Sequence, residues 1–137
     1  MLLFVHPAFQ QLPEPIQAAL LALAEEPEES RENLVRMVIA YRRHLGAVGP
    51  SLPVVNLTLA ERLADASIAL LQGLADETPD TERRLAQVAI RYFVEADDGQ
   101  EDLISPDGLE DDRLVFNAAA AALGREDLVV MDSFAAD

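Results

Sequence analysis

Apolar residues recur at helical spacing along most of the chain. In residues 28–45 they return every three or four positions and form a broad stripe that includes Leu34, Val38 and Leu45. Glutamates stand near the beginning of this segment and basic residues at its end, which is the charge order that the helix macrodipole favours. The pattern predicts a helix over residues 28–45, with Gly46 as its C-cap.

The same spacing predicts four further helices and a short terminal one. They cover residues 16–26, 58–75, 79–95, 109–124 and 128–134. Thr58 and Glu61 have the spacing of a capping box, and Asp107 and Glu110 have N-cap and N3 spacing. Residues 53–55 are expected to be extended. The sequence therefore predicts an all-α fold, a single compact bundle of five to six helices.

Length and composition agree with one helical domain over residues 1–137. Residues 1–12 form a lead-in segment, residues 95–108 an acidic loop, and residues 135–137 a frayed end. Half of the residues are apolar but only 5% are aromatic, so the core is expected to consist of Leu, Val, Ile and Ala, which suit helix-on-helix packing. The chain contains neither lysine nor cysteine, which excludes Schiff-base chemistry, P-loop phosphate binding, disulfides and thiolate catalysis.

The net charge of -15 restricts the classes of partner. Direct nucleic-acid binding requires a basic surface, and ten arginines face 25 carboxylates here. A basic protein partner is favoured instead. The longest stretch without Asp, Glu or Arg, residues 44–60, contains two glycines and two prolines, so no membrane span is expected. We expect a cytoplasmic protein, and the sequence leaves its oligomeric state open.

The densest charge lies between Glu95 and Asp112, where nine acidic residues occur without a basic one. Carboxylates are the ligands that Mg, Mn or Ca ions prefer, and they make this segment a candidate divalent-cation site. The candidate metal ligands are Asp98, Asp102, Asp107, Asp111 and Asp112. Neither Gly99 nor Gly108 fits the EF-hand pattern. The alternative is that these carboxylates cap a helix, pair with Arg84, Arg91 or Arg113, or remain solvated.

No other residue group predicts a reaction. The spacing of Asp98 with Glu101 resembles a metal-dependent phosphohydrolase pair, but an isolated D-x-x-E is a weak signal. His6 and His44 are not followed by Asp, and nothing nearby predicts that Ser105 is a nucleophile. No catalytic residue and no cofactor-binding residue is predicted. The basic group of Arg36, Arg42 and Arg43 is interpreted as surface pairing with neighbouring glutamates rather than an anion pocket.

One stretch resembles a known family. It begins with Tyr92-Phe93-Val94, continues through Asp102-Leu103-Ile104, and reaches Gly108-Leu109-Glu110-Asp111-Asp112. Over Tyr92 to Leu123 the chain resembles the YkvA-like family, a bacterial domain of unknown function. The proline expected before the first Asp is missing, and Ser105 stands where a second is expected. The resemblance implies a helical fold with an acidic loop and implies no reaction.

These features support three hypotheses about function. The first is a small acidic interaction or regulatory module without enzymatic activity. The second is a divalent-cation-binding helical protein that uses residues 97–112, with metal-dependent hydrolysis as its catalytic version. The third is an inhibitor that mimics nucleic acid through an acidic helical face. That face would contain Glu25, Glu26, Glu28, Glu29 and Glu32.

Overall fold

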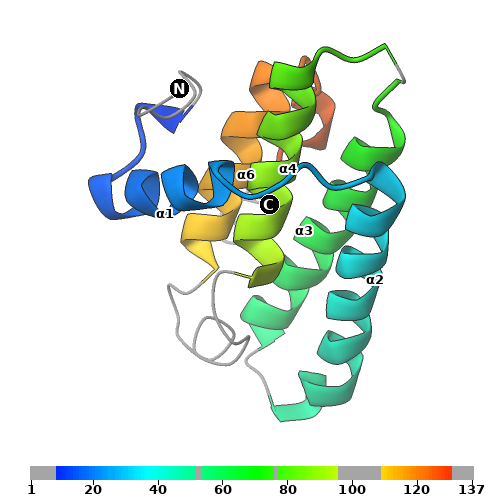
Figure 1. Ribbon diagram of the computed structural model, residues 1–137. Coiled ribbons are helices and arrows are strands. Elements are labelled where there is room, and N and C mark those ends of the chain that lie inside the picture. Colours follow the sequence, from blue (N-terminus) through cyan, green and yellow to red (C-terminus); the bar gives the residue numbers. More distant parts are fainter. Residues whose placement is uncertain (1–8, 52–53, 76, 96–108, 131–137) are drawn as a thin grey trace.

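The computed structural model describes residues 9–51, 54–75, 77–95 and 109–130, and within these ranges the chain is all-helical (Figure 1). Its elements follow one another as α1 (Glu14–Ala24), α2 (Arg31–Val48), the 3₁₀ turn η2 (Gly49–Ser51), α3 (Val54–Gln72), α4 (Asp80–Glu95), α6 (Glu110–Ala122) and the 3₁₀ turn η3 (Glu126–Leu128). The predicted all-α bundle is confirmed. No helix in these ranges has the length and apolar character needed to cross a membrane.

The helices pack in two groups that share α4 and α6. The α2–α3 hairpin packs against α4 and α6, and its buried side chains form the larger cluster around Val38, Leu63 and Ile90. On the other side, α1 lies across α4 and α6 at a steep angle (Figure 1). It buries Ile16 and Leu20 in a second cluster with side chains of α4 and α6. Helix α4 is therefore buried on two sides, which explains the continuous run of buried residues from Leu85 to Ile90.

Helix α2 differs from its predicted boundaries at both ends. It begins at Arg31, where the Ser30 hydroxyl accepts a hydrogen bond from the Asn33 backbone N–H at 3.1 Å as an N-cap. The prediction that Gly46 is the C-cap is wrong, since Gly46 lies inside the helix. Val48 packs on the core one turn after the buried Leu45, so burial favours a further turn of helix. Among the glycines that the structure describes, Gly124, just after α6, has a positive φ.

Helix α3 begins earlier than the capping-box pattern predicts. Val54 is already helical, so residues 54 and 55 are not extended and Thr58 lies in the second turn. The buried positions Asn56, Leu59 and Leu63 follow helical spacing, and they extend the buried stripe back beyond Thr58. Continuous burial thus determines the start of this helix, and the capping-box prediction is wrong.

The last two predicted elements are also shifted. Leu109 occupies the N-cap position of α6 and makes no side-chain cap, so Glu110 is the first helical residue rather than N3. Of the predicted terminal helix at residues 128–134, Leu128 ends η3 and residues 129–130 are not helical. Asn117 explains this, because its side-chain amide exchanges two hydrogen bonds with the Val130 backbone, at 2.8 and 2.9 Å. Residues 131–134 lie outside the described ranges.

Candidate functional site

The predicted metal ligands fall mostly outside the residues that the structure describes. This applies to Asp98, Asp102 and Asp107, and also to His6 and Ser105. Asp111 and Asp112 lie in the first turn of α6, where carboxylates favour the positive end of the helix dipole. Asp111 is exposed, whereas Asp112 is buried. Across the described ranges, no three His, Asp or Glu side chains gather so that they could hold a metal ion.

The clearest arrangement of charged and polar groups lies where residues 25–30 cross α4 (Figure 1). We call this segment the glutamate connection. Gln87 of α4 is buried beneath it, and its amide oxygen accepts a hydrogen bond from the Glu29 N–H at 2.7 Å. The amide nitrogen of Gln87 donates to the Pro27 carbonyl at 2.9 Å. One side chain therefore satisfies two backbone groups of a segment that has no regular structure of its own.

Arginines of α4 hold the same connection from both sides of Gln87. Arg91, whose side chain is only 12% exposed, pairs with Glu26 at 2.7 Å and with Glu29 at 3.5 Å. Arg83 pairs with Glu28 at 3.4 Å. Arg83, Gln87 and Arg91 lie at positions i, i+4 and i+8 of α4, so they form one row along the helix. Together they constitute a clasp that joins α1 to α2 across α4.

A cavity of about 250 Å³ opens beside the clasp, at the N-terminus of α2. Its polar lining includes Glu28, Glu29, Ser30, Arg31, Arg83 and Gln87. The Arg31 guanidinium donates to the Leu74 carbonyl, and Arg83 and Gln87 are engaged with the connection. The polar groups of this cavity therefore serve mainly to hold the fold together.

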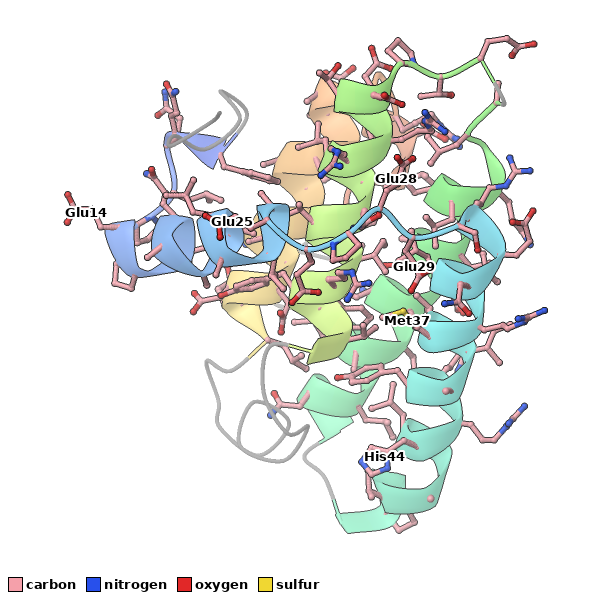
Figure 2. The ribbon with its side chains drawn as sticks, in the orientation of Figure 1. Glu14, Glu25, Glu28, Glu29, Met37 and His44 are labelled. Atoms are coloured by element: carbon pink, nitrogen blue, oxygen red, sulfur yellow. The ribbon has the colours of Figure 1, made fainter. Side chains whose placement is uncertain are left out.

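Several exposed carboxylates lie along α1, the glutamate connection and the start of α2. Glu14 projects from the free end of α1, and Glu25 follows its last turn (Figure 2). Glu28 and Glu32 lie where the connection enters α2, and the Glu32 side chain is 68% exposed. We call Glu14, Glu25, Glu28 and Glu32 the acidic face. All four side chains are exposed, although Glu28 pairs with Arg83 and Glu32 pairs with Arg31.

The arginines of α2 that were predicted to pair with surface glutamates differ in their contacts. Arg42 reaches α3, where it pairs with Asp65 at 2.8 Å and Glu61 at 3.8 Å, so the pairing prediction is correct for this residue. Arg36 and Arg43 are exposed and form no ion pair within the part of the chain that the structure describes. They flank Ile39, which is 41% exposed. Among the described residues, Ile39 is the large apolar residue with an exposed side chain. We call Arg36, Ile39 and Arg43 the basic stripe.

The packing also places two aromatic residues and His44. Tyr41 and Phe93 belong to the core, where their rings meet edge to face with centroids 4.7 Å apart. His44 is exposed on α2 and is followed by another turn of helix, so it does not end the helix as predicted.

Near the C-terminal end, Arg125 donates two hydrogen bonds of 3.1 Å to the Asp127 carboxylate. This bond is the main cause of a lowered pKa of Asp127 and a raised pKa of Arg125.

The sequence signal for the clasp is weak. The four-residue spacing of Arg83, Gln87 and Arg91 is visible in the sequence, but only the fold shows that glutamates some sixty residues earlier lie opposite them.

No protein-family model, curated protein or solved structure matches the chain. The resemblance to the YkvA-like family therefore stays a prediction.

Proposed function

We propose that the protein is a small interaction module that binds a basic partner through its acidic face and catalyses no reaction itself. The observation that carries this proposal is the way in which opposite charges are distributed. Arg91 and Arg113 are largely buried, with side chains 12% and 16% exposed. The carboxylates of the acidic face lie at the surface.

Several arginines therefore act as connectors within the fold. Arg91 and Arg83 hold the glutamate connection, and Arg113 pairs with Glu110 and donates to the Val130 carbonyl at 3.3 Å. Each of these arginines neutralises the carboxylates that it contacts, and Arg83 does so for Glu28 of the acidic face, but 25 carboxylates outnumber ten arginines. The excess of carboxylates in a chain of net charge -15 is consequently presented to solvent. A surface of this kind accelerates association with a partner of opposite charge.

The clasp also gives the acidic face a fixed shape. Glu25 and Glu28 belong to a segment held to α4 by Gln87 and two arginines, so their backbone positions are defined before a partner arrives. Preorganisation lowers the entropic cost of binding. This distinguishes the acidic face from a flexible acidic tail, which would have to be ordered during association.

Binding of a fluorescein-labelled, lysine-rich helical peptide tests the proposal directly. Fluorescence anisotropy should show binding near about 0.05 M salt that weakens steeply toward about 0.5 M, because the Debye length shortens over this range. A variant with Glu14→Gln, Glu25→Gln and Glu32→Gln should bind at least about tenfold more weakly. A peptide of the same length with glutamine in place of lysine should not bind.

The matched control neutralises three other exposed carboxylates. Glu77→Gln, Glu82→Gln and Glu126→Gln remove the same charge from the α3–α4 turn, α4 and η3. This variant should retain most of the affinity. Equal losses in both variants would mean that net charge alone attracts the peptide, and would overturn the assignment of the acidic face.

A further inference from the structure

The basic stripe of α2 is unusual in so acidic a chain. Arg36 and Arg43 stand seven residues apart, about 10 Å along the helix axis, and Ile39 lies between them on neighbouring turns. Most other arginines of the described chain contact a carboxylate or a backbone carbonyl. Arginine is enriched at interaction hot spots, and the exposed Ile39 adds apolar area between the two arginines. A surface that complements this stripe therefore has carboxylates on both sides of an apolar area.

The outer face of α1 has that chemistry. Glu14, Ala18, Ala22 and Glu25 follow helical spacing, and all four are exposed. Glu14 and Glu25 form no ion pair within the described residues. The two alanines leave a flat apolar surface between the carboxylates, and a branched side chain such as that of Ile39 can pack on such a surface.

The spacing of charges on the two helices is compatible. The two glutamates are about 16 Å apart along α1, against about 10 Å for the two arginines. When the centres of the two faces coincide, each carboxylate lies about 3 Å beyond its arginine along the axis. The long arginine side chain can bridge this offset. Helices α1 and α2 lie on opposite sides of the molecule (Figure 1), so the two faces do not meet within one copy.

We propose that the basic stripe of one copy docks on the outer face of α1 of a second copy. The contact is heterologous, because the basic stripe of one copy binds a different face, that of α1, on the next copy. Contacts of this kind generate head-to-tail chains or rings. It occupies two carboxylates of the acidic face, so self-association and the binding of a basic partner compete. A contact between two helix faces is small, which makes it a weak and reversible association.

The proposal is tested with the protein alone, by sedimentation equilibrium at about 0.15 M ionic strength, where charges more than about 8 Å apart are largely screened. The wild-type weight-average mass should rise with concentration. Two double variants should each remain monomeric, namely Arg36→Glu with Arg43→Glu and Glu14→Arg with Glu25→Arg. An equimolar mixture of these variants should associate again, because each carries a face that complements a face of the other.

The design separates face-to-face docking from an effect of net charge. The first double variant is more negative than wild type and the second is less negative, so general repulsion predicts opposite effects, whereas docking predicts a loss in both. Two controls should associate as wild type does: Arg62→Glu on α3, which adds half the negative charge of the first double variant, and Glu77→Arg with Glu126→Arg, which matches the charge change of the second. All substituted positions are exposed, and circular dichroism will verify that each variant is folded.

Three results would overturn the proposal. The first is a wild-type protein that remains monomeric up to millimolar concentration. The second is greater association of the less negative variant, which would show that net charge governs the equilibrium. The third is a mixture of the two variants that stays monomeric although each has lost association.

Discussion

Glu29 and Gln87 are 58 residues apart in the sequence, yet the backbone N–H of the first donates to the buried amide oxygen of the second at 2.7 Å. The other end of the same amide binds the Pro27 carbonyl. Gln87 is thus the point at which α4 fixes the connection between α1 and α2. The position of the acidic face depends on this contact.

Replacement of Gln87 by alanine should destabilise the protein more than an ordinary polar substitution. It leaves the Glu29 N–H and the Pro27 carbonyl without their partner, and an unsatisfied group in a partly buried site costs about 1 to 3 kcal/mol. We expect a loss of about 2 kcal/mol in the free energy of unfolding, measured by urea denaturation. Gln72→Ala, at an exposed position of α3, is the control. Equal stabilities of the two variants would contradict the role of Gln87.

Removal of Arg91 tests the ionic part of the clasp. Arg91→Met retains much of the apolar stem but loses the pairs with Glu26 and Glu29, and should lower stability by about 2 kcal/mol at low salt. The difference from wild type should shrink near about 1 M salt, where the Debye length is about 3 Å. Arg62→Met removes an exposed arginine from α3 and should change stability very little. A salt-independent loss would indicate that packing, not charge, explains the role of Arg91.

The Arg125–Asp127 pair predicts a local pH dependence. The hydrogen bond from Arg125 lowers the pKa of Asp127 in the folded state. Its contribution to stability is therefore complete above the ordinary aspartate pKa of about 3.9, and is lost as the pH falls through the lowered folded value. Arg125→Ala should move the pKa of Asp127 upward, as an NMR titration of the carboxyl carbon would show. Arg43→Ala should leave it unchanged, and an unchanged pKa in Arg125→Ala would refute the assigned cause.

Metal removal tests the alternative function derived from residues 97–112. If these residues bind no ion, EDTA-stripped protein should melt at the same temperature with Mg, Mn or Ca. A specific ion at a hundred times its dissociation constant would instead stabilise the fold by about 2.7 kcal/mol, a shift of several degrees. A selective shift that Asp111→Ala abolishes would support the metal site. Asp111 is preferred to Asp112 for this test because it is exposed, so its replacement leaves the core intact.

Helical periodicity was sufficient to predict the fold class and the approximate place of each helix, because the buried stripes are continuous. It was less accurate at the ends. Gly46 and Thr58 have the residue types of caps, but the helices extend past them, and the apolar side chains of Val48 and Leu57 pack on the core. Tertiary packing outweighs local capping preferences at these positions, since a cap contributes about 1 kcal/mol and a buried apolar side chain contributes more.

The candidate site was less predictable than the fold. The sequence shows that Arg83, Gln87 and Arg91 lie on one side of a helix, but the partners of that row depend on how α1 and α2 cross α4. The same applies to Arg42, whose carboxylates lie on α3 rather than on its own helix. Interactions between residues far apart in the sequence require the three-dimensional arrangement, and composition alone revealed only that carboxylates would be in excess.

The most direct test of the proposed acidic interaction module is an NMR titration of the ¹⁵N-labelled protein with the lysine-rich peptide. The account predicts that the backbone amide signals of Glu14, Glu25, Glu28 and Glu32 shift most, and that added salt reverses these shifts. Shifts spread evenly over all exposed carboxylate positions, or centred on α6 and η3, would contradict it.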